Sequence, residues 1–270
     1  MAYSTGYSAP QGDPPLSPRK TLPTMYDLPS EFPGEPGLPD EFHSLQPQLL
    51  ARTLSLANYT RSQWFSSSDL NLYYDVHHPL WFKRPDWFLA VGVPRLYDGH
   101  DLRRSYVVWQ EGTSPTVAVE FLSPGTEASD LGRFCTRDDK IDDDPAGQPQ
   151  TADTTPDKLT VYEQFLRIPH YLVYCRRKQH LRYFQLIAGR YQEQSLSADL
   201  PTVWLEDLGV GLGLWEGEFE GVVGRWLRWC DGEGQWLLTD TEQARLAQKN
   251  AEQRAAQLAQ RLRKLGIDPG

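Results

Sequence analysis

The chain of 270 residues is long enough for one medium-sized domain with extensions, or for two small domains. Its 39% hydrophobic and 12% aromatic content is sufficient for a packed core. The formal net charge of −9 argues against a general polyanion binder, because lysine and arginine supply most of the affinity for phosphate. This net charge does not exclude an enzyme that binds a polyanion through a local basic groove and a metal ion.

The three cysteines form no Cys-x-x-Cys pair, which excludes a disulfide framework and a structural zinc site as the basis of the fold. No apolar run approaches the roughly 18 residues of a membrane span. The N-terminal residues lack the basic region followed by an apolar stretch that a signal peptide has. We therefore expect a soluble cytoplasmic protein.

The first forty residues are predicted to form an extended arm that packs little against the rest of the chain. Proline blocks both helix interiors and central strands, and it is frequent here. The prolines are Pro10, Pro14, Pro15, Pro18, Pro23, Pro29, Pro33, Pro36 and Pro39.

A helix is expected over residues 42–54, with Pro47 as a candidate for its first turn. Alternating apolar residues then predict a strand over residues 69–76. A polar turn is expected at residues 98–101, between two further strands.

Each of these two further strands carries one carboxylate. Asp86 opens the apolar stretch 85–91, and Glu120 lies inside the apolar stretch 116–122. A carboxylate on a buried strand is costly unless a cation or a hydrogen-bond donor compensates it. Two such strands side by side would form an oxygen-rich site suited to Mg²⁺ or Mn²⁺.

The alternative is that each carboxylate caps a loop or pairs with a nearby arginine, such as Arg84 or Arg133. Either explanation accounts for one acid on its own.

Residues 123–155 are mostly polar and are predicted to form a solvated loop. The loop lacks the ligand spacing and the central glycine of a calcium-binding loop. Its acids include Asp138, Asp139, Asp142, Asp143 and Asp144.

Thr155, Pro156 and Asp157 predict the start of a helix, with a hydroxyl cap, a first-turn proline and an early acid. A buried strand should follow at residues 170–175. Residues 181–187 and 190–193 then predict a hairpin that turns at Ala188 and Gly189.

Residues 204–238, rich in glycine and tryptophan, are expected to form short strands that cover the sheet. Residues 239–265 predict a long helix that ends at Gly266. One face of this helix is a narrow apolar seam, which favours either a dimerising coiled coil or a single helix partly docked on the body. The seam consists of Ala251, Ala255, Leu258, Leu262 and Leu265.

The order helix, three strands, helix, strand, with acids on the second and third strands, resembles the PD-(D/E)XK nucleases. More closely, the chain resembles the cyanobacterial form of the Uma2 family of restriction-endonuclease-like proteins, formerly DUF820. The likeness covers roughly residues 40–238, with the terminal helix as an accessory. It is carried by segments 41–43, 84–86, 119–126 with Asp130, 158–162, 169–174, 211–217 and 262–267.

This resemblance implies an α/β (α+β) fold: a restriction-endonuclease-like core with a mixed central sheet, flanking helices and a long C-terminal helix. It also divides the chain into an arm (1–40), a nuclease-like domain (41–238) and a helix of amphipathic or coiled-coil type (239–265).

The resemblance assigns Asp86 and Glu120 as metal ligands. In the parent nucleases a lysine stands two residues after the second acid, but here that position is Leu122. The matching lysine is Lys158 on the following helix, where it would assist the attacking water, with Tyr162 one turn later. The alternative for Lys158 is a solvated side chain in the first helical turn.

Further residues are candidates for a supporting role around the site. Asp130 corresponds to a family acid, but residues 131–157 separate it from the lysine, so its role could be only to cap or steady the site. Glu41 could be a further ligand or an exposed acid. His43 could lie near the site or be a hydrogen-bonded structural histidine.

The function implied is a metal-dependent endonuclease that uses Mg²⁺ or Mn²⁺ to hydrolyse phosphodiester bonds in DNA, either alone or as a homodimer. The alternative is a catalytically inactive nuclease-like fold that serves as a binding or oligomerisation module. A serine or cysteine hydrolase is disfavoured because no Gly-x-Ser-x-Gly elbow is present.

Overall fold

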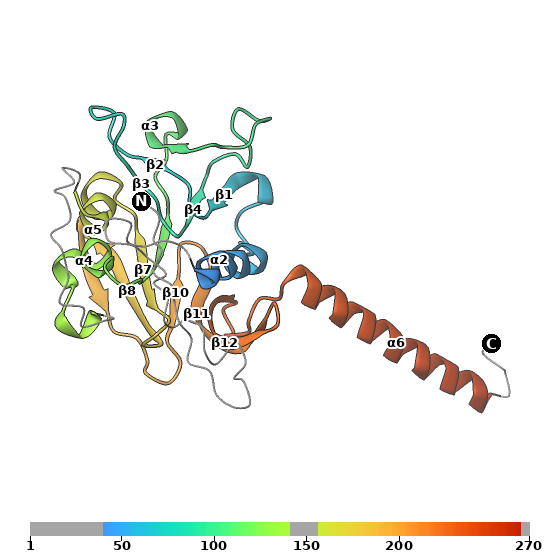
Figure 1. Cartoon of the computed structure of the whole chain (residues 1–270). Helices are drawn as coiled ribbons and strands as arrows, with labels where there is room; N and C mark the ends of the chain where they lie inside the picture. Colours follow the sequence, from blue (N-terminus) through green and yellow to red (C-terminus); the bar gives the residue numbers. More distant parts are fainter. Residues whose placement is uncertain (1–39, 141–155, 266–270) are drawn as a thin grey trace, which may run out of the picture.

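The computed structural model describes residues 40–140 and 156–265 (Figure 1). The arm expected at 1–40 therefore lies almost wholly outside the described residues, as do Thr155, Gly266 and the acids at 142–144. Within the described ranges, no helix is long and apolar enough to cross a membrane.

The centre of the molecule is a six-stranded mixed sheet in the order β1-β4-β6-β7-β8-β9. Strands β6 and β7 pair in parallel, and the other neighbours pair antiparallel. Because β6 and β7 are parallel, the residues that follow them emerge at the same edge of the sheet. The strands are β1 (Trp64–Ser67), β4 (Trp87–Val91), β6 (Val117–Phe121), β7 (His170–Cys175), β8 (His180–Ile187) and β9 (Arg190–Gln194).

Both faces of this sheet are covered, so β6 is buried along its whole length. Alternate residues point to opposite faces. Val117 and Val119 pack into one core cluster with α2 and the second sheet, whereas Ala118 packs into the other cluster with Leu131 and Leu159. The same alternation places Glu120 on the face covered by helices α4 (Glu127–Leu131) and α5 (Lys158–Thr160) (Figure 1).

Helix α2 (Glu41–Thr53) covers the opposite face with a three-stranded sheet, β10 (Thr202–Leu205), β11 (Val210–Phe219) and β12 (Val222–Cys230). These strands cover the main sheet as predicted, but β11 and β12 are long rather than short.

The predicted start of α2 at Pro47 is wrong. Asp40 caps the helix by accepting a hydrogen bond from His43 N at 3.0 Å, so Pro47 lies inside the helix. The neighbouring buried Gln46 joins the helix to the edge of β12, because its amide donates to Leu227 O at 2.9 Å and accepts from Leu227 N at 2.8 Å.

A small sheet, β3-β2-β5, lies beside the main one and contains β2 (Leu72–Tyr73), β3 (Phe82–Lys83) and β5 (Tyr106–Val107), followed by helix α3 (Val108–Glu111). The prediction that residues 69–76 supply a core strand is therefore wrong. The first strand of the central sheet is β1, which follows a short 3-10 helix (Arg61–Gln63) and pairs with β4.

The predicted loop at 123–155 begins instead with helix α4 (Glu127–Leu131) and two 3-10 turns (Gly132–Phe134 and Arg137–Asp139). Helix α5 (Lys158–Thr160) then continues as a π-helix (Val161–Phe165). Its cap is Asp157, which accepts from Thr160 N at 2.6 Å, and not the hydroxyl expected at Thr155.

The predicted hairpin is formed by β8 and β9. Ala188 and Gly189 have φ values of +50° and +80°, as a tight two-residue hairpin turn requires.

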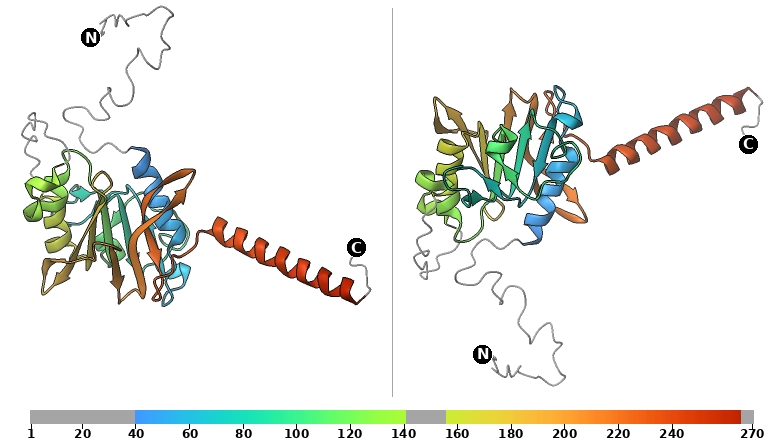
Figure 2. Two further views of the ribbon diagram at one scale, coloured as in Figure 1. Left: turned by 90° about the horizontal axis from the view of Figure 1, so that it is seen from below. Right: turned by 90° about the horizontal axis from the view of Figure 1, so that it is seen from above.

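Helix α6 (Asp240–Lys264) projects from the body in all three views (Figures 1 and 2). Its first turn is tied down by buried Arg228, which donates to Glu242 and to Leu237 O, and by Arg52, whose Nη2 lies 3.0 Å from an Asp240 oxygen. No residue of α6 is buried.

Candidate active site

Asp86 and Glu120 lie side by side at the junction of β4 and β6. The Phe121 amide donates to Asp86 Oδ2 at 2.6 Å, and the Asp86 amide donates to Glu120 Oε2 at 3.3 Å. Glu120 is fully buried, whereas Asp86 is half-buried. One carboxylate is thus enclosed by the protein and the other lies nearer the solvent.

Lys158 completes the cluster from the first residue of α5. Its Nζ lies 2.9 Å from Glu120 Oε2 and 3.1 Å from Asp130 Oδ1. The side chain is only 20% exposed, so Lys158 is not a solvated first-turn lysine. The structure therefore brings Asp86, Glu120, Asp130 and Lys158 together.

Two buried tyrosines fix the cluster through hydrogen bonds. Tyr162 donates its hydroxyl to Glu120 Oε1 at 2.6 Å, from the π-helical segment that continues α5. Tyr171 on β7 donates to Asp130 O at 2.7 Å and packs edge-on against the Tyr162 ring. Both tyrosines are fully buried, so Glu120 and Asp130 are held by side chains that pack in the core.

The electrostatics of the cluster follow from burial and from an excess of acids. Burial raises the pKa of Glu120 well above its usual value, and the Asp86 and Asp130 charges raise it further against the opposing effect of Lys158. Burial likewise raises the pKa of Asp130. Burial alone would lower the pKa of Lys158, but Asp130 and Glu120 outweigh it and raise that pKa well above its usual value.

The position of Lys158 depends on a close approach between α5 and Gly132. Gly132 has a φ of +49°, and a Cβ atom added to it would lie 2.7 Å from Leu159 Cδ2. A larger residue could not occupy this position without moving Leu159, and Lys158 is its neighbour in the chain.

The arginines considered as alternative partners of the acids are engaged elsewhere. Arg84 lies 3.4 Å from Asp69, and Arg133 lies 2.6 Å from the buried Glu163.

The two candidates on α2 differ in their placement. Glu41 is exposed in the first turn of α2. His43 contacts Asp40 through Nδ1 at 2.7 Å, and its Nε2 lies 3.2 Å from both Phe121 O and Ser123 Oγ. His43 is therefore a hydrogen-bonded neighbour of the carboxylate strand.

Sequence reasoning gave no role to Tyr171, Ser123, Arg176 or Arg177, all of which border the cluster or the strand that carries it. The available signal was the basic run 176–178 directly after the buried strand 170–175. Since residues after parallel neighbours share a sheet edge, this run could have been placed next to the residues that follow Glu120.

The donor chemistry of the cluster fits a hard divalent cation, although the described residues contain no group of three or more His, Cys, Asp or Glu side chains already arranged to hold one. Three acids face one lysine, which leaves an excess of negative charge, and carboxylate oxygens are the ligands that Mg²⁺ prefers. Asp130 Oδ1 is buried, and it lies 3.1 Å from Lys158 Nζ.

Comparison with known proteins places the chain in a family. A model of the Uma2 family, described as "Putative restriction endonuclease", matches residues 25–215. No curated protein matches the chain. A crystal structure from Anabaena variabilis ATCC 29413, of a protein described as a "putative nuclease belonging to DUF820", is similar with 11% identity and a TM-score of 0.41, over 64% of this chain and 77% of that one.

The family match spans most of the chain and includes Asp86, Glu120, Asp130 and Lys158. At 11% identity and a TM-score of 0.41, the structural likeness adds nothing about individual residues. On the strength of the family model, the chain is a member of the Uma2 family.

Proposed function

We propose that this protein is a metal-dependent endonuclease that hydrolyses phosphodiester bonds in DNA, with residues 41–238 as its nuclease-like unit. Asp86 and Glu120 would hold Mg²⁺ or Mn²⁺, and Lys158 would assist the attacking water. The observation that carries the proposal is the contact of 2.9 Å between Lys158 Nζ and Glu120 Oε2. It joins residues from two separate elements, at the positions where the family resemblance expects a lysine and an acid.

The metal, when bound, would supply Lewis-acid stabilisation of the phosphate oxygens and a more acidic water. Because the raised pKa of Lys158 keeps it protonated, this side chain acts as a positive donor and not as a base. Its ammonium group can orient the water and stabilise negative charge that develops on the phosphate. Tyr162 fixes the Glu120 carboxylate through its hydrogen bond of 2.6 Å.

The test is the cleavage of supercoiled plasmid DNA with Mg²⁺ or Mn²⁺ by the native protein and by Asp86→Asn, purified identically. We expect the native protein to cut and Asp86→Asn to lose at least about 100-fold in rate, the scale seen when one charge-stabilising group of an active site is removed. Asp86 suits this comparison because it is half-buried and its replacement leaves the core packing intact.

Asp69→Asn is the matched control, since Asp69 is an acid that is mostly exposed and pairs with Arg84. It should cut at the native rate. Equal cutting by Asp86→Asn and the native protein would place the activity elsewhere or in a contaminant. If the native protein does not cut, and neither ion raises its thermal stability, the inactive binding module becomes the better explanation.

We also propose that the protein forms a homodimer through α6. The helix has 25 residues, none of which is buried, and its first turn is fixed to the body by Arg228 and Arg52. A helix held in this way presents its apolar seam to solvent, with Leu258 59% exposed. Pairing with the same seam of a second copy would bury it.

Replacing Leu258 and Leu262 together by glutamate is expected to convert the dimer into a monomer. The two changes place charges in the centre of the seam, where like charges of the two copies would meet. Light scattering coupled to gel filtration measures the mass directly. Glutamate at Gln253 and Gln257, which lie outside the seam, should leave the dimer intact. A native protein that is monomeric at all concentrations would contradict the proposal.

A further inference from the structure

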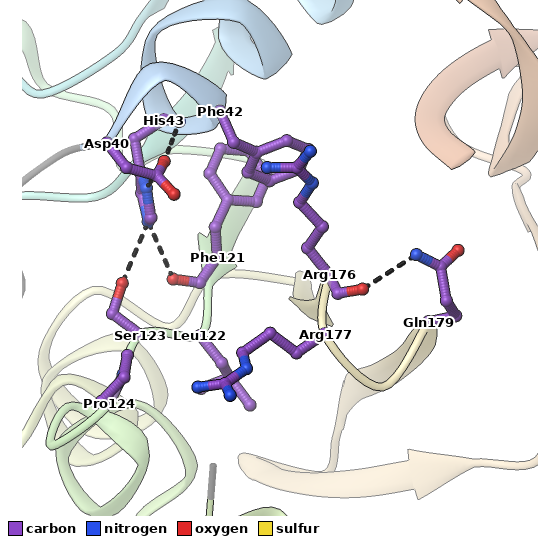
Figure 3. Close-up of a pocket in the computed structure, with 10 residues that line it drawn as sticks. All are labelled: Asp40, Phe42, His43, Phe121, Leu122, Ser123, Pro124, Arg176, Arg177 and Gln179. Carbon is purple, nitrogen blue, oxygen red and sulfur yellow. Dashed lines mark hydrogen bonds and ion pairs between the residues drawn. The ribbon is translucent and has the colours of Figure 1, made fainter. Parts of the chain in front are cut away.

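A cavity of about 250 Å³ opens at the sheet edge where β6 and β7 end (Figure 3). His43 from α2 forms one wall, and Phe121 and Ser123 from the end of β6 form the floor. Arg176 and Arg177, in the turn after β7, form the other side. The cavity is thus bounded by the strand that carries Glu120 and by two adjacent arginines.

The cavity and the carboxylate cluster share one strand end. Phe121 lines the cavity, and its amide donates to Asp86 Oδ2 at 2.6 Å. His43 Nε2 lies 3.2 Å from Phe121 O. Burial lowers the pKa of His43, but the hydrogen bond to Asp40 and the negative charge of Asp86 outweigh burial and raise it. A group bound in the cavity would therefore lie at the same end of β6 as the proposed metal ligands.

The charge of the cavity favours an anion. Arg176 and Arg177 contribute two positive charges, and Asp40 is the acid among the lining residues. Asp40 is already bonded to the backbone and the ring of His43, at 3.0 and 2.7 Å. The net charge is positive even with His43 neutral, on a chain whose formal net charge is −9.

The two arginines stand on a fixed turn. Gln179 Nε2 donates to Arg176 O at 2.8 Å across the turn, and Lys178 Nζ donates to Lys140 O at 2.7 Å. The Arg176 guanidinium lies over the Phe42 ring, 5.0 Å from its centre. In Figure 3 the Arg177 side chain extends beside Leu122, so the two arginines point to different sides of the cavity.

We propose that this cavity binds a phosphate group of the DNA strand, at the end of β6 that also carries the proposed metal ligands, with Arg176 and Arg177 as its ligands. The inference rests on the proposed nuclease function and assigns the cavity as a contact for the substrate backbone. At about 250 Å³ it is smaller than the roughly 300–1,000 Å³ of sites that enclose a whole small molecule. It suits one group of a longer chain that continues outside it.

A larger cavity, of about 660 Å³, lies near β5 and also contains arginines. Its walls include Arg103 and Arg104. Arg103 is held by Glu111 at 2.7 Å, with both side chains almost fully buried. Unlike the first cavity, this larger cavity is not lined by Phe121, whose amide donates to Asp86.

The test is binding of a fluorescein-labelled DNA duplex by the full-length protein in EDTA, measured by fluorescence anisotropy over a series of salt concentrations. Without divalent metal no cleavage interferes. We expect Arg176→Ala with Arg177→Ala to weaken binding and to make the plot of log Kd against log salt shallower by about one per lost phosphate contact. Arg176→Lys with Arg177→Lys keeps the charge and should keep most of the slope.

The control is Arg104→Ala with Arg225→Ala, which removes two exposed arginines outside the cavity and should leave the slope unchanged. Circular dichroism and urea unfolding of each variant confirm that the fold is intact. A control that lowers the slope as much as the cavity variant would overturn the assignment, because the effect would then be one of overall charge.

The outcomes separate this inference from the proposed function. If the native protein cuts DNA but the slope is independent of Arg176 and Arg177, the phosphate site is wrong and the nuclease remains. If binding depends on both arginines but no DNA is cut, the site stands and the enzyme does not. Stabilisation by inorganic phosphate that needs the arginines, without any effect on DNA binding, would assign the cavity to a free anion and overturn the proposal.

Discussion

Replacing Lys158 by methionine is expected to lower the free energy of unfolding by about 3 to 5 kcal/mol at neutral pH, the loss that follows when one partner of a buried ion pair is removed. Methionine keeps much of the length and the apolar stem, so little packing is lost. It removes the ammonium group that contacts Glu120 at 2.9 Å and Asp130 at 3.1 Å. Urea denaturation followed by tryptophan fluorescence gives the change directly.

Lys249→Met is the matched control, since Lys249 is exposed on α6. It should change stability by less than about 0.5 kcal/mol. The deficit of Lys158→Met should shrink at acidic pH, because protonation of Glu120 and Asp130 removes the charges that need a partner. If Lys158→Met lowers the free energy of unfolding as little as the control does, water and not Lys158 compensates the charges of the acids.

Glu120→Gln is expected to abolish cleavage and yet to stabilise the folded protein near neutral pH, by a gain on the order of 1 kcal/mol. The amide oxygen can accept from Lys158 and from the Asp86 amide as the carboxylate does. The amide NH₂ group can donate to the Tyr162 hydroxyl, which reverses the direction of that hydrogen bond. It removes a buried charge that Asp86 and Asp130 repel. On this expectation, the native carboxylate makes the folded protein less stable than an amide at the same position would.

The pH dependence gives the sign of this effect. The pKa of Glu120 is raised in the folded state, so the folded protein holds this proton more tightly than the unfolded chain does. The contribution of Glu120 to the free energy of unfolding is therefore fully present below its pKa in the unfolded chain, about 4. It is lost as the pH rises through the pKa in the folded protein. Glutamine does not titrate, so Glu120→Gln does not lose this stability as the pH rises. Its free energy of unfolding should therefore exceed that of the native protein at pH values above the folded pKa of Glu120.

Unfolding by urea at a series of pH values measures both curves. Glu41→Gln, at an exposed acid of α2, should follow the native curve. Mg²⁺ should raise the thermal midpoint of the native protein and of Glu41→Gln but not that of Glu120→Gln. A variant that is less stable than the native protein at every pH would mean that the carboxylate is held by more favourable contacts than those to Lys158 and Tyr162.

The strands that carry the acids could be predicted because a charged residue in a short apolar run is conspicuous. Asp86 precedes β4 and Glu120 lies in β6, as the pattern indicated. The family resemblance supplied Lys158, because nothing local distinguishes this first-turn lysine from a solvated one. Its contacts with Glu120 and Asp130 arise from the packing of α4 and α5 on the sheet, which leaves no mark in the spacing of the chain.

Other parts of the fold could not be predicted from the sequence, for related reasons. Residues 69–76 alternate like a strand, yet β2 contains only Leu72–Tyr73, while β1 pairs with β4. Alternation reports which side chains are buried but not which sheet buries them. The cavity beside Arg176 could not be inferred directly, because it needs α2, the end of β6 and the turn after β7 to meet.

The packing that positions the cluster also constrains which residue can stand at position 132. Gly132 has no side chain, and it is not itself one of the charged residues. Still, Leu159 fills the space that a Cβ atom would need, and Leu159 is bonded in the chain to Lys158. Lys158 stands on a helix and the carboxylates stand on a sheet, so the geometry of the cluster depends partly on the residues where the helix and the sheet pack together. The choice of residue at position 132 is thereby restricted, although glycine contributes only its absence of bulk.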